Sequence, residues 1–420
     1  MKSKFHPHEY IFPTHQTTKY IISSETITFI DNETITPIDK EAMARKRQVL
    51  DMKRFNKFYS TVPTLIENVN LNNLLSRFNE SMTLIEPFAG DCDLLNMFKP
   101  DLMKTDKIAL IELFDITTID DSNITSLKPP IDKYEKYDSL KDEIFDADGA
   151  PYFVATNPPY TAKNKLDEET KRKYKQIMTD IQDLYQIFIK QLINKSNLIN
   201  GGCIIIPSNF MFGNQSRNLR NQFLSVFDIV NLSIFERRMF DYTTQSVITL
   251  TFIRKDLNIS SPSREEEMVI KLYTTNEIKT ISPEDFTYIL NFDFQNEFRV
   301  NEGKSVIIKR NYNINAEAKM FVSDIKVSLL DPKIEAYIDT ENKDIQDKET
   351  DRAYMRLCFD KQFNLEQETN ICKLFNDMLN NLRKRTSSLV LTSYREYSRK
   401  RLSFEEVYII MNHAISHMLG

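Results

Sequence analysis

A short apolar run that ends in an amide, two prolines and an aromatic ring is the feature that most limits how this chain can fold. The run is Tyr152–Ala155, and after one further residue come Asn157, Pro158, Pro159 and Tyr160. Proline has no backbone N–H to donate, so it cannot extend a central strand. The pattern therefore predicts a buried strand whose chain leaves the sheet at Asn157.

The residues at this strand end suit a planar molecule that carries an exocyclic amino group. The side-chain oxygen of Asn157 and the carbonyl of Pro158 can accept both amino hydrogens, and the ring of Tyr160 can stack on the molecule. Such bonds draw electron density onto the nitrogen and place it for in-line attack on a methyl donor. A plain Asn-Pro turn between a strand and a helix is the structural alternative, so the tetrapeptide needs support from elsewhere in the chain.

Two segments upstream place acidic side chains at predicted strand ends. Residues 83–95 read as a strand that ends at Glu86, a tight turn at Gly90 and the start of a helix. Glycine lets the backbone of such a turn approach a ligand closely. Residues 107–112 read as a second strand that ends in Glu112, an acid suited to bidentate bonding of a ribose diol.

A polar break at Asp138 and Ser139 follows these two strands. The carboxylate of Asp138 can accept a hydrogen bond from an adenine amino group. Ligands of open α/β sheets bind at the carboxyl ends of the strands, and each of these segments lies at such an end. The segments and the tetrapeptide together therefore predict one binding site at one edge of a sheet.

In these residues and their order, the chain resembles the S-adenosylmethionine-dependent DNA amino-methyltransferases, specifically the gamma arrangement of adenine-N6 enzymes. The resemblance covers about residues 50–256, and its most specific part is the loop from Asn157 to Tyr160. It implies an α/β fold, a Rossmann-like methyltransferase doubly wound sheet with a C-terminal α+β target-recognition domain. The cofactor-binding residues that it implies, all for S-adenosyl-L-methionine, are Thr61, Glu86, Phe88, Ala89, Gly90, Glu112, Asp138, Ser139 and Asn157.

The same resemblance implies a mechanism. A target adenine flips out of the duplex, Tyr160 stacks on it and Phe240 presses on its other side or edge. Asn157 and Pro158 accept the amino hydrogens, and the nitrogen attacks the sulfonium methyl in line without a covalent enzyme intermediate. The catalytic residues implied are Asn157, Pro158, Pro159, Tyr160 and Phe240.

One position departs from the family pattern. The family's turn carries a second glycine two positions after the first, where this chain has Cys92. A small thiol is tolerated there if the backbone keeps an ordinary conformation. A poorer fit would weaken cofactor binding or make it depend on a partner. Buried cysteine usually behaves as a small apolar residue, which favours that role over a reactive one.

The length of 420 residues exceeds that of one compact domain. We expect an N-terminal arm with a hairpin over residues 1–50 and a methyltransferase domain over 51–256. A linker over 257–267 and a target-recognition domain over 268–420 follow, with a strand near 268–273.

The net charge of −5 argues against a protein surface that is basic overall and binds nucleic acid everywhere. DNA binding depends on local basic patches, because these set the electrostatic field at the phosphate backbone. The most basic stretch lies in the predicted recognition domain, where side chains can lie along phosphates of double-stranded DNA. A solvated face that pairs with acids is the equally weighted alternative. The predicted DNA-binding residues are Arg383, Lys384, Arg385, Arg395, Arg399, Lys400 and Arg401.

Cysteine usage and hydropathy predict a cytoplasmic protein. The four cysteines are widely spaced and show no metal pairing, which favours a reducing compartment and predicts no metal site. No apolar run is long enough to span a bilayer, and no signal-type core begins the chain. We therefore expect an intracellular protein with no membrane partner.

The sequence as a whole favours a site-specific DNA adenine-N6 methyltransferase of a restriction-modification system, with a cognate restriction endonuclease or another subunit as a partner. Three alternatives stay open. A cytosine-N4 methyltransferase uses nearly the same site, but more often with Ser in place of Asn157. An RNA or protein-glutamine methyltransferase can carry the same tetrapeptide, usually without a large C-terminal domain. A non-catalytic DNA-binding subunit that kept the fold is supported only by Cys92.

Overall fold

The computed structural model is divided into two compact units, Met1–Asn56 and Lys57–Gly420. In the first unit, the strands β1 (Lys19–Ile22) and β2 (Ile27–Ile30) pair in antiparallel register, which confirms the expected hairpin. The residues that the structure describes are 19–22, 27–30, 63–116, 131–141, 143–175, 177, 181–240, 245–257, 268–300, 303–310, 320–331, 333–340, 353–394 and 399–419.

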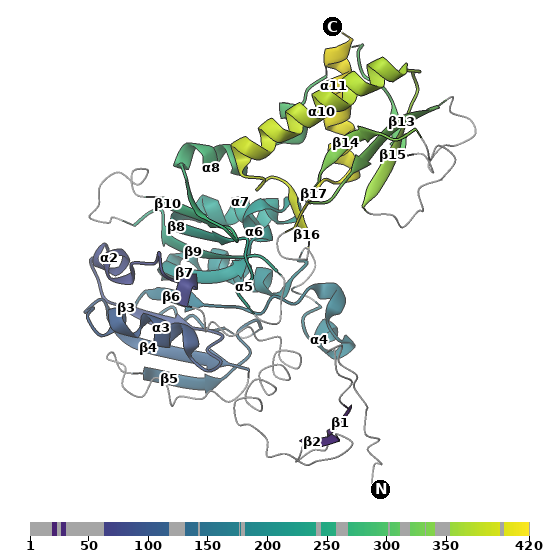
Figure 1. The fold of residues 1–420 in the computed structure, drawn as a ribbon. Coiled ribbons are helices and arrows are strands. Elements are labelled where there is room, and N and C mark those ends of the chain that lie inside the picture. The colour runs from purple at the N-terminus through teal and green to yellow at the C-terminus, as the bar shows by residue number, and fades with distance from the viewer. Residues whose placement is uncertain are drawn as a thin grey trace. The chain divides into compact units, whose positions relative to one another are not determined.

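The second unit contains a nine-stranded sheet in the order β11-β10-β8-β9-β7-β6-β3-β4-β5 (Figure 1). Neighbouring strands are parallel except at β9, which is antiparallel to β7 and β8, and at β11, which is antiparallel to β10. The strands are β3 (Met82–Glu86), β4 (Ile108–Asp115), β5 (Ile131–Lys136), β6 (Tyr152–Thr156), β7 (Ile199–Pro207), β8 (Phe227–Phe235), β9 (Val247–Arg254), β10 (Val269–Tyr273) and β11 (Ile278–Ile281).

The central strands β3, β6 and β7 are buried along their whole length. Parallel strands covered on both faces read as continuous apolar runs, and this explains why the sequence shows no alternation there. The connecting α-helices are α2 (Leu71–Ser76), α3 (Asp93–Leu102), α4 (Glu168–Lys173), α5 (Leu184–Asn194), α6 (Asn209–Phe212) and α7 (Arg217–Val226), with short 3-10 turns η1 (Pro63–Leu65), η3 (Lys163–Lys165), η4 (Ser196–Leu198) and η5 (Asn214–Ser216). The expected doubly wound α/β sheet is confirmed.

The strand expected near 268–273 is present as β10, but it extends the main sheet by pairing in parallel with β8. Its buried side chains Ile270, Leu272 and Tyr273 belong to the same hydrophobic cluster as the other strands. Strand β11 adds one more antiparallel neighbour. The sheet thus continues beyond residue 256, where the predicted methyltransferase domain ends, and the predicted division of the chain into an arm, two domains and a linker stays a prediction.

The C-terminal part has its own hydrophobic cluster and an antiparallel four-stranded sheet in the order β12-β15-β13-β14. This mixture of strands and helices is the expected α+β arrangement. Its elements are α8 (Pro283–Leu290), α9 (Phe294–Glu297), β12 (Ile308–Arg310), β13 (Phe321–Ser328), β14 (Glu335–Ile338), β15 (Tyr354–Phe359), α10 (Leu365–Thr386), the paired strands β16 (Thr392–Tyr394) and β17 (Arg399–Arg401), and α11 (Phe404–Met418).

Helices α10 and α11 both begin with a capping box, in which the first side chain and the side chain three residues later satisfy each other's backbone N–H. In α10 the pair is Asn364 and Gln367, and in α11 it is Ser403 and Glu406. Across the described ranges, no helix combines the length and the apolar character that a bilayer crossing needs.

Candidate active site

The loop from Asn157 to Tyr160 leaves the sheet directly after β6, as predicted. Tyr160 is only 3% exposed. Its hydroxyl contacts two acceptors, the side-chain oxygen of Asn157 and the carbonyl oxygen of Ile205, the latter at 2.9 Å. A hydroxyl has one proton to donate, so these two acceptors share it. The hydroxyl of Tyr160 thus occupies the side-chain oxygen of Asn157, which is the atom predicted to accept an amino group, and this contact fixes the position of the tyrosine ring.

Two further aromatic rings contact Tyr160. The ring of Phe240 lies 6.3 Å from it, centroid to centroid, at an interplanar angle of 64°. The ring of Tyr185 on α5 lies at 6.5 Å and 89°, and its hydroxyl donates to the side-chain oxygen of Asn209 at 2.9 Å. The structure thus brings together Tyr160 and Phe240, as the resemblance implies. Sequence reasoning did not single out Tyr185, which lies in an apolar helix without a distinguishing pattern.

The turn after β3 is built around Gly90, whose φ is +54°. Its N–H donates to the carboxylate of Asp115 at 2.9 Å, and the N–H of Ala89 donates to the carbonyl of Phe114 at 2.9 Å. A Cβ added at Gly90 would meet no heavy atom within 4 Å. The positive φ, and not a lack of space, therefore requires glycine here, and the turn is open on that side.

Cys92 does not keep the ordinary backbone conformation on which its tolerance depends. Its φ of 58° and ψ of 23° place it in the left-handed region, at the N-cap of α3. A side chain in this region costs about 1–2 kcal/mol. The thiol is buried, and burial raises its pKa to about 12, so the expected role as a small apolar side chain fits and a reactive role does not.

Glu86 ends β3 and is 2% exposed. Burial raises its pKa to about 8, and the negative charge of Asp115 adds to the rise, whereas hydrogen bonds from the backbone of Phe88 and Asn157 oppose it. Glu86 therefore carries a proton at neutral pH. A cation next to this carboxyl group would favour its ionised form.

Glu112 and Asp115 both lie on β4, but only the second ends the strand. Sequence reasoning ended this strand at residue 112 and assigned Glu112 to the ribose. The strand continues through the apolar pair Leu113 and Phe114, and the carboxylate that meets the Gly90 turn belongs to Asp115. Both acids are buried. The apolar residues Leu113 and Phe114 indicate that the strand continues, and on this basis its end could have been predicted at Asp115.

Asp138 already has partners within the chain. Its carboxylate oxygens each lie 3.0 Å from the hydroxyl of Tyr174, and one lies 2.5 Å from the ammonium of Lys173. Lys173 ends α4 and Tyr174 follows it, so both come from the segment after the loop from Asn157 to Tyr160. Ser139 beside Asp138 is buried. The predicted adenine contact of Asp138 therefore competes with contacts from this segment.

The predicted DNA-binding residues at the end of α10 contact other parts of the protein. Arg383 forms an ion pair with Asp331 at 2.8 Å. The guanidinium of Arg385 lies 3.5 Å from the ring centroid of Tyr288 and 3.7 Å from the carboxylate of Glu297.

Two basic residues of β17 also have partners. Lys400 is buried and forms an ion pair with Glu236, and Arg401 lies over the ring of Phe404 at 5.6 Å. Lys384 on α10 is exposed. The roles of all these side chains toward DNA stay predictions. Two predicted site residues, Thr61 and Arg395, and the side chain of Arg399 lie outside the part of the chain that the structure describes.

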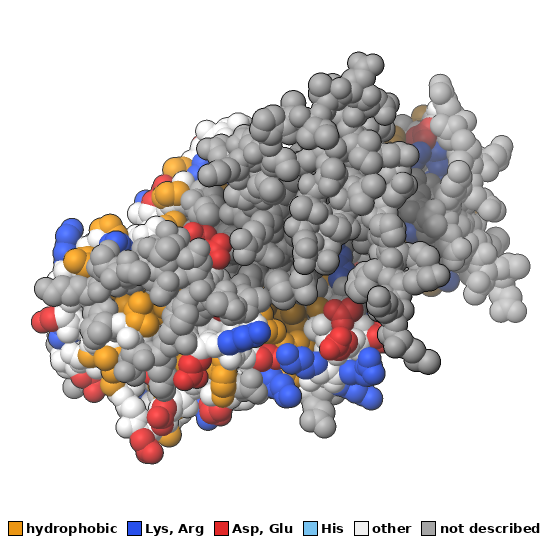
Figure 2. Space-filling model, turned by 90° about the horizontal axis from the view of Figure 1, so that it is seen from below, with side chains coloured by type: hydrophobic (Ala, Val, Ile, Leu, Met, Phe, Trp, Pro, Cys, Tyr) orange, Lys and Arg blue, Asp and Glu red, His pale blue; other side chains and the backbone are white. Residues whose placement is uncertain are grey.

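Figure 2 shows Lys and Arg side chains gathered beside Asp and Glu side chains on one face of the molecule. Among the described residues, Lys171 forms an ion pair with Glu168, and Lys195 forms one with Glu143.

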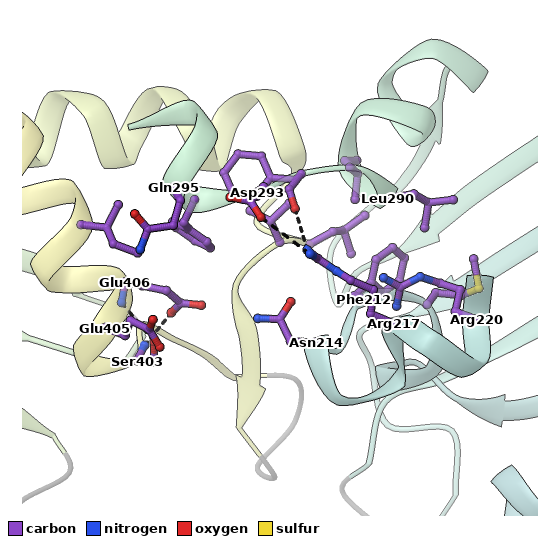
Figure 3. Close-up of a pocket in the computed structure, with 17 residues that line it drawn as sticks. Phe212, Asn214, Arg217, Arg220, Leu290, Asp293, Gln295, Ser403, Glu405 and Glu406 are labelled. Atoms are coloured by element: carbon purple, nitrogen blue, oxygen red, sulfur yellow. Dashed lines mark hydrogen bonds and ion pairs between the residues drawn. The ribbon is translucent and has the colours of Figure 1, made fainter. Parts of the chain in front are cut away.

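A polar cavity of about 270 Å³ lies between α7 of the sheet region and α9 and α11 of the C-terminal part (Figure 3). On one wall, Arg217 donates to the carbonyl of Phe292 at 3.1 Å and lies 3.6 Å from the carboxylate of Asp293. On another wall are Ser403 and Glu406 of the capping box. Of the predicted catalytic and cofactor-binding residues that the structure describes, none lines this cavity. It is therefore separate from the candidate active site.

Residues 37–240 match the model of the family described as "Eco57I restriction-modification methylase". This segment, slightly less than half of the chain, is similar to restriction-modification methylases. It contains the glycine turn, the Asn157 loop and Phe240. No curated protein matches the chain.

Solved structures of three kinds are similar to part of this chain. A modification subunit of a putative type I restriction enzyme from Vibrio vulnificus YJ016 has 16% identity and a TM-score of 0.39 over 58% of this chain and 54% of that one. A putative class I S-adenosylmethionine-dependent methyltransferase from Listeria monocytogenes has 13% identity and a TM-score of 0.40 over 60% and 78%. The type IIG restriction endonuclease BpuSI has 14% identity and a TM-score of 0.42 over 66% and 40%. The chain thus spans little more than half of the Vibrio protein and less than half of BpuSI.

Proposed function

We propose that this protein is a site-specific DNA methyltransferase that transfers a methyl group from S-adenosylmethionine to the N6 amino group of a flipped-out adenine. The observation that carries the proposal is the proximity of two strand ends. β3 and β6 are parallel neighbours in the sheet, so the turn of Gly90 and the loop of Asn157 lie side by side. Glu86 at the end of β3 also accepts a hydrogen bond from the backbone of Asn157. A cofactor turn and an acceptor for an amino group at one sheet edge are what this transfer needs.

The residues present fit S-adenosylmethionine. The turn at Gly90 is open where a Cβ would lie, which leaves space for a ligand close to the backbone. The buried carboxyl group of Glu86 would hold the cationic methionine part, and Asp138 would accept from the adenine. Glu112 or Asp115 on the neighbouring strand would face the ribose. When bound, the cofactor supplies an activated methyl group, so positioning and electrostatics remain the tasks of the protein.

The catalytic loop would act through hydrogen bonding and stacking. The hydroxyl of Tyr160 leaves the oxygen of Asn157, which then accepts one amino hydrogen of the base while the Pro158 carbonyl accepts the other. The rings of Tyr160 and Phe240 hold the extruded base, whose flipping costs about a few kcal/mol. The amino nitrogen is thereby aimed at the methyl donor.

Substrate and location follow from the same proposal. The match to a restriction-modification methylase family supports double-stranded DNA as the substrate and a cognate endonuclease or a further subunit as a partner. The four cysteines are all buried and form no disulfide bond, which supports the reducing cytoplasm as the place of action.

The test is nucleoside mass spectrometry of unmethylated DNA after incubation with the protein and isotopically labelled S-adenosylmethionine. We expect labelled N6-methyladenine with the native protein and none with Asn157→Ala. The matched control is Asn218→Ala, which removes an exposed asparagine on α7 and should leave the product unchanged. Labelled N4-methylcytosine would move the proposal to the cytosine enzymes. DNA without any labelled base would contradict DNA methylation by this chain alone.

A further inference from the structure

We infer that Lys400 is a positioning residue of the base pocket and not a phosphate contact: through Glu236, it holds the segment 236–240 that places Phe240 against Tyr160. The inference rests on the proposed function, since it takes Phe240 as a wall of that pocket. It assigns one of the predicted DNA-binding side chains a different role.

The backbone of Lys400 is fixed to the C-terminal part. Its N–H donates to the carboxylate of Asp331 at 2.8 Å, and the N–H of Asp331 donates to its carbonyl at 3.1 Å. The other carboxylate oxygen of Asp331 accepts from Arg383 on α10 at 2.8 Å. The strand β17 that carries Lys400 is thus tied both to the segment after β13 and to the end of the long helix.

The side chain of Lys400 reaches from there to the main sheet. Its ammonium pairs with Glu236, the first residue after β8. The side chains of Lys400 and Glu236 are only 6% and 16% exposed, so the pair is shielded from water. The N–H of Glu236 donates to the carbonyl of Tyr273 at the end of β10, at 2.8 Å. Glu236 is therefore held from both sides.

Four residues after Glu236 comes Phe240, whose ring contacts the ring of Tyr160. The segment is closed by a local bond, in which Nε of Arg238 donates to the carbonyl of Phe240 at 3.1 Å. Contacts therefore join Asp331 to Lys400 and Lys400 to Glu236, the backbone leads from Glu236 to Phe240, and the ring of Phe240 contacts that of Tyr160. We name these residues the Lys400 contact chain.

Burial decides between the two roles of Lys400. A lysine that binds a phosphate must reach solvent, whereas this side chain is almost fully covered. If its ammonium moved to a phosphate, the carboxylate of Glu236 would be left shielded and without its counter-charge, which is strongly unfavourable. Lys384 on α10 is exposed and meets the requirement for a phosphate contact. It is therefore the matched control.

The chain contains no tryptophan, so Phe240→Trp gives a single tryptophan, excited selectively at long wavelength, as a reporter in the pocket wall. In this background, we expect Lys400→Met and Glu236→Gln each to shift the emission to longer wavelength and to increase quenching by acrylamide. Lys384→Met should change neither quantity. Unchanged emission in a folded Lys400→Met protein would overturn the inference.

Kinetics and salt dependence separate positioning from phosphate binding, with Phe240 intact. Lys400→Met should lower kcat by about tenfold to a hundredfold, as misplacement of catalytic groups does, with the KM for DNA little changed. The slope of log K for DNA against log salt should stay as in the native protein, whereas Lys384→Met should reduce it by about one. A reduced slope with normal kcat in Lys400→Met would instead show a phosphate contact.

The reversed pair, Lys400→Glu with Glu236→Lys, guards against a variant that merely fails to fold. If positioning of Phe240 requires the ion pair, the protein with the reversed pair should show the same tryptophan emission as the Phe240→Trp protein that keeps Lys400 and Glu236. A reversed protein that folds, by circular dichroism, but keeps the shifted emission would contradict the inference. The emission of the Phe240→Trp protein can be measured without turnover, so it tests the contact chain independently of methylation. If no DNA is methylated, the proposed function is contradicted, but the emission still tests the role of Lys400.

Discussion

The hydroxyl of Tyr160 contacts the side-chain oxygen of Asn157, the atom that is proposed to receive an amino group of the base. The same hydroxyl contacts the carbonyl of Ile205. The loop thus satisfies its own acceptor, and the proposed binding of a base would exchange one partner of Asn157 for another. This exchange avoids leaving a buried polar group without a partner in either state.

Tyr160→Phe separates stacking from this hydrogen bond. The phenyl ring can still stack on a base, and no hydroxyl competes for Asn157, so methyl transfer should be retained. Tyr160→Ala removes the stacking surface and should reduce kcat/KM by about 10-fold to 100-fold, as expected for loss of base stacking. Single-turnover methylation of unmethylated DNA measures both. Equal losses in the two variants would mean that the hydroxyl itself is essential.

Cys92 gives a test of backbone strain. Glycine normally destabilises a fold relative to alanine. At a left-handed position the order reverses, so Cys92→Gly should be more stable than Cys92→Ala by about 1 kcal/mol. Urea unfolding of the two variants measures the difference, and titration with S-adenosylmethionine shows whether the relaxed turn binds more tightly. Alanine as the more stable variant would place Cys92 outside the left-handed region.

Glu86 makes cofactor binding depend on pH. Its carboxyl group carries a proton below about pH 8, and a cationic ligand favours the ionised form. Affinity for S-adenosylmethionine should therefore rise with pH and level off near pH 8, with proton release on binding. Calorimetry in buffers of different ionisation enthalpy measures the release. Glu86→Gln should lose this component, while Asp93→Asn, which removes a carboxyl group whose pKa burial raises to about 6, should keep it.

The same group affects stability with the opposite sign. From its ordinary pKa of 4.5 up to about 8, the folded chain keeps a proton on Glu86 that the unfolded chain has lost. The free energy of unfolding contributed by Glu86 therefore falls as the pH rises through this range. Denaturant titrations at several pH values should show a flatter profile for Glu86→Gln than for the native protein. Parallel profiles would contradict a buried, protonated Glu86.

The contacts of Asp138 predict that the α4 segment competes with the cofactor. Lys173→Met combined with Tyr174→Phe frees the carboxylate and should tighten binding of S-adenosylmethionine, whereas Asp138→Asn should weaken it. Equilibrium titration measures the three affinities. Weaker binding in the double variant would mean that Lys173 and Tyr174 belong to the cofactor site. Lys171→Met, on the same helix but paired with Glu168, is the control.

The sequence predicted those parts of the candidate site whose conformation depends on neighbouring residues in the chain. Prolines after an apolar run had to end β6, and a glycine between a strand and a helix had to form the turn, so the loop of Asn157 and the turn of Gly90 were both found. The left-handed conformation of Cys92 could not be found in this way, because cysteine rarely adopts it. The end of β4 was placed too early because Glu112 interrupts an apolar run that then resumes.

Contacts between distant segments lay beyond the sequence pattern. Nothing near Lys400 in the chain points to Glu236, and a basic stretch reads the same whether its side chains face phosphates or carboxylates. Likewise, only the folded chain shows that Tyr174 lies against Asp138. Such pairs depend on how remote strands meet, which local periodicity does not encode.

The parallel pairing of β10 with β8 has a practical consequence for dissecting this protein into fragments. A fragment that stops at residue 256 would strip β8 of one neighbour and remove Tyr273, whose ring stacks on Phe235 at 4.7 Å. A long apolar strand with unpaired backbone groups is a template for intermolecular association. Expression of the N-terminal fragment alone should therefore yield aggregates unless the fragment extends past Ile281.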